Sequence, residues 1–113
     1  MRASPNRRSR QLRGSLDLLV LKALSLESLH GVGVFRRIQQ ITNQTIEVSY
    51  GSLFPALHRL EHRGWLDAEW RTSENSRQAK FYRLTKAGRK ELECEEREWR
   101  RIVEAVIAAL ESS

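Results

Sequence analysis

The sequence has little cysteine and no long apolar run, and each shortage excludes a class of protein. Cys94 is the only cysteine, so the chain cannot form an internal disulfide, which suits a reducing cytosol. No apolar run approaches the roughly 20 residues that a helix needs to cross a bilayer. The stretch "LDLLVLKALSL" is a poor secretory signal, because Asp17 and Lys22 interrupt it and no small-residue cleavage site follows. We therefore expect a cytoplasmic protein with no membrane partner.

Length and composition predict one small folded domain. The 113 residues are 40% hydrophobic and 30% charged, which is typical of globular rather than disordered chains. A chain of this size buries only a modest core, and such folds often gain stability by oligomerising.

Acidic residues are absent from the first 13 positions, which carry five arginines. Residues 71–90 hold seven basic side chains against one acidic, whereas residues 91–113 hold three against seven. A polyanion would be attracted to both basic blocks, although ordinary solvated charge explains the pattern equally well. Residues 1–13 show no periodicity and are predicted to form a disordered arm. Two interpretations of this arm stay open, insertion into a DNA minor groove and a solvated tail.

Hydrophobic periodicity predicts helices in the first half of the chain. Residues 16–27 are apolar on most sides and indicate a buried helix. The segment "HGVGVFRRIQQITN" (30–43) places four apolar residues at helical spacing, with Arg36, Arg37 and two glutamines outside, which indicates a half-buried helix. Residues 45–49 alternate and predict a short strand at most.

The next segment, "SYGSLFPALHRLEHRGWL", predicts a third helix. Ser49 can cap it through its hydroxyl. Pro55 lacks a backbone N–H, so the first turn is expected either to be irregular or to begin nearer Ser52. Gly64 is expected to end the helix, as a C-terminal glycine does.

The second half of the chain predicts a hairpin and a long helix. "WLDAEWR" and "KFYRLT" alternate as strands, with the polar loop "TSENSRQA" between them. Thr85 is expected to cap the final helix. Apolar residues at spacings of 7, 4, 3 and 4 give that helix a seam like that of a coiled coil. The seam residues, predicted to form a dimer interface, are Leu92, Trp99, Val103, Val106 and Leu110.

The third helix contains "HRLEH" (58–62), which has the spacing of one class of zinc peptidase. A helix would place His58 and His62 on one face, as a metal requires. No third ligand stands out downstream, however, and Arg59 and Arg63 would surround the cation with positive charge. We therefore expect no metal, no cofactor and no enzymatic activity.

The two faces of this helix indicate instead that its outward side binds another molecule. One face is apolar and consists of Leu53, Ala56, Leu57 and Leu60. The opposite face consists of Ser52, Pro55, His58, Arg59 and His62. It is either a plain solvated surface or a nucleic-acid contact. The second interpretation fits the N–H groups and positive dipole of a helix N-terminus, which suit phosphate, and the close backbone approach that Gly51 permits.

The position after a helix and a short turn is that of a recognition helix in a helix-turn-helix. Ser52, His58 and Arg59 can donate to phosphates or base edges. The following hairpin carries Arg77, Gln78 and Lys80 near its tip, as the wing of a winged variant would.

These motifs resemble those of the PadR-like transcriptional regulators, in the short form found in acidobacteria. The matching stretches are "LDLLVLKAL", "HG", "GSLFPALHRLEHRGWL", "EW", "TSEN" and "AKFYRLTKAGRKEL", within about residues 14–110. The resemblance implies a winged-helix DNA-binding domain, here residues 14–84, a C-terminal dimerisation helix in residues 85–113, and usually repression of nearby genes. The chain departs from the family pattern at Phe54 and Val32, where tyrosine is common; the first change removes a hydroxyl that could meet phosphate.

The predicted fold class is therefore mainly α with a small β-wing, a winged helix-turn-helix that binds a two-fold site on double-stranded DNA as a homodimer. The residues expected to contact DNA are Tyr50, Gly51, Ser52, Phe54, Pro55, His58, Arg59, Arg77, Gln78 and Lys80. Trp99 has two interpretations, packing in the dimer core or lining a pocket for a small aromatic effector, as a tryptophan does in a multidrug-binding branch of the family. The alternative function is a winged-helix module that binds protein rather than DNA.

Overall fold

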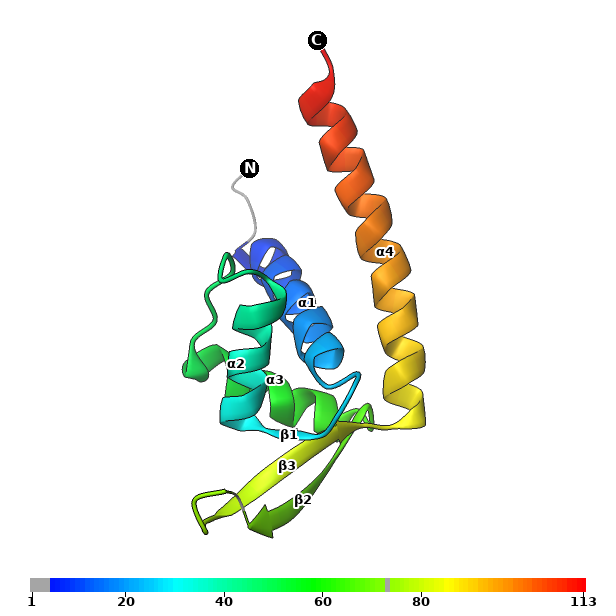
Figure 1. The fold of residues 1–113 in the computed structure, drawn as a ribbon. Coiled ribbons are helices and arrows are strands. Elements are labelled where there is room, and N and C mark those ends of the chain that lie inside the picture. Colours follow the sequence, from blue (N-terminus) through cyan, green and yellow to red (C-terminus); the bar gives the residue numbers. More distant parts are fainter. Residues whose placement is uncertain (1–4, 73) are drawn as a thin grey trace.

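A computed structural model describes residues 5–72 and 74–113, with side chains from Gly14 onward. Four helices and a small antiparallel sheet with strand order β1-β3-β2 make up this part of the chain (Figure 1). The elements are α1 (Pro5–Ala23), β1 (Leu29–His30), α2 (Gly31–Ile41), α3 (Tyr50–His62), β2 (Leu66–Thr72), β3 (Gln78–Leu84) and α4 (Lys86–Glu111). The predicted fold class, mainly α with a β-wing and a long C-terminal helix, is confirmed.

The secondary structure of the first half of the chain differs from the prediction in two places. The helix expected from about residue 16 begins at Pro5, so most of the predicted disordered arm is helical, and residues 1–4 lie outside the described residues. Proline is tolerated in a first helical turn, and arginine and leucine are good helix formers, so the helix extends N-terminally through these residues. Residues 45–49, for which a short strand at most was expected, run as a loop, and the short strand β1 forms instead at Leu29–His30, where none was predicted.

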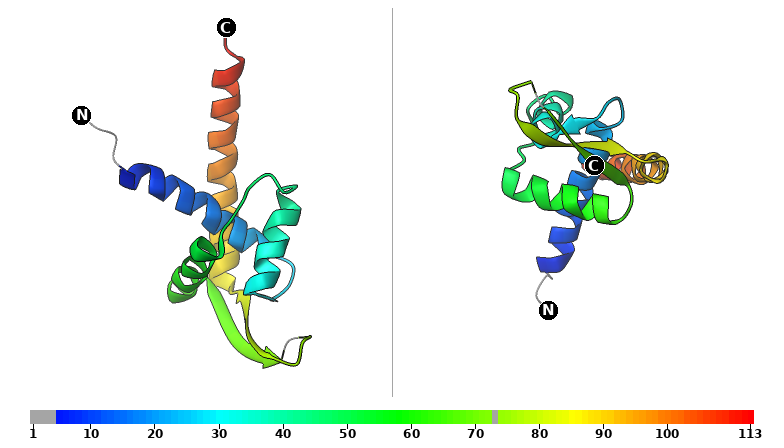
Figure 2. Two further views of the ribbon diagram at one scale, coloured as in Figure 1. Left: turned by 90° about the vertical axis from the view of Figure 1, so that its left-hand side faces the viewer. Right: turned by 90° about the horizontal axis from the view of Figure 1, so that it is seen from below.

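The core lies where α1, α2 and α3 meet each other, the sheet and the first turns of α4. It is aliphatic except for Tyr82, whose pKa is raised by burial. Its fully buried large side chains are Val20, Leu21, Leu24, Val34, Ile38, Leu53, Leu57, Leu60 and Leu66. Because α1 contacts the other three helices, its C-terminal half lies at the centre of the domain, while its N-terminal end projects outward (Figure 2).

Local hydrogen bonds set both ends of α3. The Ser49 hydroxyl accepts from the Ser52 N–H at 3.2 Å, which confirms the predicted cap. The helix begins at Tyr50 and runs through Pro55, so the expected irregular or delayed start was wrong. At the other end, Gly64 has φ of +81°, and the N–H groups of Gly64 and Trp65 donate back to carbonyls of the last turn. Glycine adopts this left-handed conformation at no steric cost, so the chain turns sharply into β2.

The helix α4 extends well beyond the rest of the domain (Figure 1). Thr85 caps it as predicted, accepting from the Gly88 N–H at 3.0 Å. Leu92 was predicted in the intermolecular seam, but it is buried in the core of the single chain, because the first turns of α4 still pack on the domain. Farther along, Val103, Val106 and Leu110 are exposed. None of the described helices is long and apolar enough to cross a bilayer.

Candidate nucleic-acid interface

The outward face of α3 is formed by polar, small and ring side chains. Leu53, Ala56, Leu57 and Leu60 are all fully buried beneath it. The exposed side chains of the outward face belong to Ser52, Pro55, His58 and His62, with Gly51 beside them. The division of the helix into an apolar and an outward face, predicted from the periodicity, is therefore correct at these positions. The face offers hydroxyl and imidazole groups together with open backbone at Gly51, where the nearest atom to an added Cβ would be the Ser49 hydroxyl at 3.8 Å.

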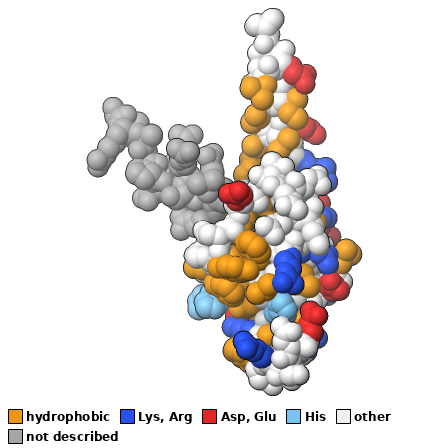
Figure 3. Space-filling model, turned by 60° about the vertical axis from the view of Figure 1, so that its left-hand side comes forward, with side chains coloured by type: hydrophobic (Ala, Val, Ile, Leu, Met, Phe, Trp, Pro, Cys, Tyr) orange, Lys and Arg blue, Asp and Glu red, His pale blue; other side chains and the backbone are white. Residues whose placement is uncertain are grey.

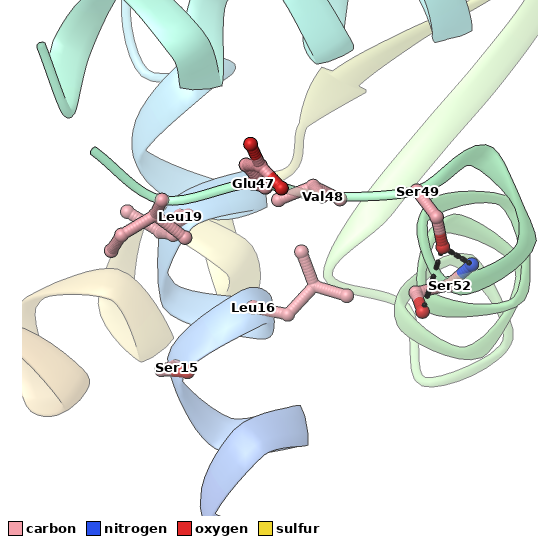
Figure 4. Close-up of a pocket in the computed structure, with 8 residues that line it drawn as sticks. Ser15, Leu16, Leu19, Glu47, Val48, Ser49 and Ser52 are labelled. Atoms are coloured by element: carbon pink, nitrogen blue, oxygen red, sulfur yellow. Dashed lines mark hydrogen bonds between the residues drawn. The ribbon is translucent and has the colours of Figure 1, made fainter. Parts of the chain in front are cut away.

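Beside the N-terminus of α3 lies a hollow between α1 and the loop that precedes α3. Leu16 and Leu19 come from α1, Glu47 and Val48 from the loop, and Ser49 from the cap of α3 (Figure 4). The cap hydroxyl donates to the Ser52 hydroxyl at 3.2 Å. The aliphatic lining of the hollow separates the start of α3 from α1, and Glu47 is the one charged residue among the described side chains that line it.

Three aromatic rings join the first turns of α3 to α2. The Tyr50 ring stacks on Phe35 with 4.5 Å between centroids and on Phe54 at 5.9 Å. Phe54 in turn covers Gly31, since a Cβ added there would come within 2.6 Å of a ring carbon. Tyr50 and Phe54, both predicted to contact DNA, are therefore partly packing residues, although each still presents an exposed edge.

Arg59 was predicted on the outward face, and that placement was wrong. Its guanidinium turns sideways and donates to the Asp17 carboxylate of α1 at 2.6 Å, where both side chains are mostly buried. Burial raises the pKa of Asp17 above its ordinary value of 3.8, and the hydrogen bond from Arg59 opposes that shift. The sequence periodicity missed the pairing because Arg59 lies at the border of the face, 42 residues from its partner along the chain.

Lys80 is also engaged inside the protein. Its ammonium donates to the Glu61 carboxylate of α3 at 2.8 Å, and this bond raises the pKa of Lys80. Arg77 and Gln78 lie nearer the hairpin loop and are exposed, as expected. Within the described part of the chain no ion pair engages Arg77. Of the predicted wing cations, Arg77 is thus the one free to bind an anion.

A groove between the N-terminus of α2 and the hairpin adds two residues that the sequence analysis did not propose for the site. It brings Arg36 and Trp70 together with Phe54, Arg77 and Lys80. Trp70 alternates with polar residues on β2, on the side of the strand that faces the core farther back at Leu66 and Ala68, yet its own side chain is 67% exposed. The core ends at Ala68, so the next inward-facing residue of the strand extends past it into the groove. The groove combines cations with aromatic surface, a combination that suits a sugar–phosphate backbone.

The zinc-peptidase spacing at residues 58–62 lies on α3, where His58 and His62 are exposed. Glu61, the acid of that pattern, is paired with Lys80. Across the described residues there is no group of three or more His, Cys, Asp or Glu that could hold a metal ion.

A second surface of the protein lies along α4, away from α3. Hydrophobic side chains follow this helix outward from the domain (Figure 3). Where α4 leaves α1, Trp99 and Val103 face Leu18 and Leu19 across a hollow. Trp99 is half-buried and lies at the end of the apolar face that is nearest the domain. It therefore belongs both to the predicted seam and to a hollow, and its two interpretations stay open.

Three helices, a two-stranded hairpin with exposed basic residues, and a capped third helix with an outward polar face define a winged helix-turn-helix domain. The sequence model of the Transcriptional regulator PadR-like family matches residues 20–94, and the chain belongs to this family. Members of the family are DNA-binding transcriptional regulators and not enzymes.

Individual relatives agree with this assignment. The chain is 35% identical over 77 residues to the Transcriptional regulator Rv3488 of Mycobacterium tuberculosis, a match that covers 68% of each protein. A PadR family transcriptional regulator from Eggerthella lenta is 28% identical, with 96% of this chain and 93% of that one covered and a TM-score of 0.74. A PadR-like transcription factor from Bacteroides fragilis is 26% identical, with coverages of 92% and 98% and a TM-score of 0.75.

Proposed function

We propose that the protein acts in the cytoplasm as a homodimeric repressor that binds a two-fold operator on double-stranded DNA. Each protomer would insert the outward face of α3 into a major groove and lay its hairpin along the neighbouring backbone. The observation that carries the proposal is the position of that face beside a groove that holds Arg36, Arg77 and Trp70. One continuous surface of the protein would then contact both the bases and the phosphates of the bound DNA.

The N-terminus of α3 supports a phosphate contact. A helix begins with N–H groups that have no partner within the helix and with the positive end of its dipole. Tyr50 and Gly51 are the first two residues of α3, and both are exposed. Ser52 and His58 follow on the same surface and can donate to phosphate or base-edge acceptors.

The apolar face of α4 supports the homodimer. Its exposed members are Ile102, Val103, Val106, Ile107 and Leu110. A continuous apolar stripe on a helix that leaves its own domain is costly to expose to water, and a second copy of the same stripe can cover it. A two-fold axis through paired α4 helices would place two copies of α3 on the same DNA, which favours a palindromic operator.

Trp99 supports a small aromatic effector as a further partner. Its indole lies at the hollow between α1 and α4, where Leu18, Leu19 and Val103 add aliphatic surface. A flat apolar ligand that stacked on Trp99 would lie at the base of the paired helices, where it could alter their spacing.

Selection of DNA fragments by the purified protein, followed by a salt titration on the selected duplex, tests the proposal. The affinity should fall steeply as salt rises, since phosphate contacts release counterions. No enrichment of any fragment, together with weak binding independent of salt, would instead support a protein-binding module. Repression is checked by placing the selected sequence before a reporter gene, whose output should fall when the protein is expressed.

A further inference from the structure

Two side chains of α3 extend in nearly opposite directions, and each forms an ion pair with another element. Arg59 reaches back to Asp17 of α1 at 2.6 Å, and Glu61 reaches forward to Lys80 of β3 at 2.8 Å. At about 100° per residue, Arg59 and Glu61 lie on the two flanks of the helix. The outward face, with Pro55, His58 and His62, lies between these flanks.

Both pairs are more protected from water than the other ion pairs on the hairpin and α4. The side chains are 28% and 16% exposed in Arg59–Asp17 and 29% and 33% exposed in Lys80–Glu61. Arg83–Asp67 on the outer side of the sheet is 65% and 57% exposed, and Arg101–Glu98 on α4 is 75% and 54% exposed. Water and salt therefore screen the two α3 pairs less than the outer ones.

The buried face of α3 sets which side of the helix meets the core, and directional contacts are needed to fix the exact rotation about its axis. Leu53, Leu57 and Leu60 pack into an aliphatic core, and apolar burial has no directional preference. Charged hydrogen bonds are directional, and two of them on opposite flanks resist rotation of the helix in both senses.

We propose that Asp17 and Glu61 are positioning residues, which fix the rotation of α3 about its axis and thereby the set of side chains that meets the bases. In this arrangement Arg59 and Lys80 serve as internal anchors rather than as phosphate ligands. The inference rests on the proposed DNA-binding function. It assigns a role in sequence discrimination to two acidic residues that would otherwise only repel DNA.

The competing explanation predicts that the same substitutions tighten DNA binding. If Arg59 and Lys80 leave their partners to bind phosphate, Asp17 and Glu61 merely neutralise them in the free protein. Removing either carboxylate would then release a cation and tighten binding to specific and random DNA by similar factors.

The first experiment measures the affinities of Glu61→Gln and Asp17→Asn for the selected duplex and for random DNA. Each variant should lose about three- to tenfold of its specific-to-random ratio, the scale expected for one partly buried ion pair. The matched control is Asp67→Asn, which removes an equal charge from the exposed pair with Arg83 and should keep the ratio. An unchanged ratio with tighter binding to both DNAs would overturn the proposal.

Charge exchange provides a rescue test. The double variant Glu61→Lys with Lys80→Glu keeps the net charge and can restore the pair in reverse. It should recover most of the specific-to-random ratio lost in Glu61→Gln. If Lys80 itself binds phosphate, the exchange should instead weaken binding to specific and random DNA by similar factors and leave the ratio unchanged, which would overturn the proposal.

A measurement without DNA separates this proposal from the proposed function. Residual dipolar couplings of the α3 amides report the orientation of that helix relative to α2 in the free protein. In Glu61→Gln and Asp17→Asn the α3 couplings should change together, while those within α2 and α4 should stay as in the wild type. Unchanged α3 couplings in both variants would refute the positioning role even if DNA binds. A wild type that selects no DNA would refute the function but leave this measurement decisive.

Discussion

Gly88, in the first turn of α4, lies against the carbonyl oxygen of Trp65 so closely that no Cβ fits between them. The same oxygen accepts from the Thr85 N–H at 3.1 Å, and the Thr85 hydroxyl donates to the Gly64 carbonyl at 2.7 Å. The turn that ends α3 is therefore bonded directly to the cap that begins α4. This contact connects the helix proposed to read DNA to the helix proposed to dimerise.

Gly88→Ala should destabilise the fold by roughly 1–3 kcal/mol, because the added methyl would collide with backbone that can move only if the joint opens. Thermal or urea unfolding measures the loss. Gly14→Ala is the matched control, since its Cβ would meet only a Trp99 ring carbon at 3.8 Å. That helical variant should be as stable as the wild type or slightly more so. Equal stability of the two variants would contradict the tight contact.

Gly51→Ala should separate folding from function. Position 51 is helical, exposed and open around its Cβ, so alanine should raise stability by about 0.5–1 kcal/mol. If DNA backbone approaches the first turn of α3 closely, the same methyl should weaken binding to the selected duplex about tenfold or more. A more stable variant with unchanged affinity would show that this turn stays away from DNA.

Val103→Asp and Val106→Asp should give folded monomers. The two side chains are 48% and 52% exposed in the single chain, so an aspartate there finds water in the monomer and an apolar partner only in the dimer. Sedimentation should show half the wild-type mass, while circular dichroism should keep the helical signal. Dimers that persist in both variants would place the interface elsewhere.

Arg77→Ala should lower the slope of log affinity against log salt by about one unit per protomer, the loss of a single phosphate contact. Binding to specific and random DNA should weaken by similar factors. Adding Lys80→Ala should change the slope little further, because Glu61 already holds that ammonium. A further full unit of slope would mean that Lys80 leaves Glu61 to bind DNA.

Glu95→Gln should stabilise the protein at neutral pH by roughly 0.5 kcal/mol, the scale of exposed charge interactions. Burial, and then the neighbouring Glu91, raise the pKa of Glu95 above its ordinary value of 4.5. The folded protein thus holds this proton more tightly than the unfolded chain, and the stability contributed by Glu95 falls as pH rises from about 4.5 through the raised pKa. The advantage of the variant should disappear below about pH 4, where both states of the wild type are protonated. A constant advantage across that range would exclude titration of Glu95 as its cause.

The sequence alone determined the helices, the hairpin and the main faces. Local signals were sufficient because caps and periodicity act within a few residues, as the bonds of Ser49, Gly64 and Thr85 confirm. The family followed from short motifs at fixed separation, and the match over residues 20–94 confirms it. The two faces of α3 were readable for the same reason, since burial on one side repeats every three or four residues.

Only the tertiary structure decided which side chains stay available for a partner. Arg59 and Lys80 looked like free cations, but their acidic partners lie 42 and 19 residues away along the chain, beyond any local pattern. Leu92 fitted the seam by spacing, but the domain covers the first turns of α4 and leaves only the later ones open. Trp70 fitted the alternation of a packed strand, but the core ends before it. Periodicity shows which side of an element a residue lies on, whereas its partner depends on how distant elements pack together.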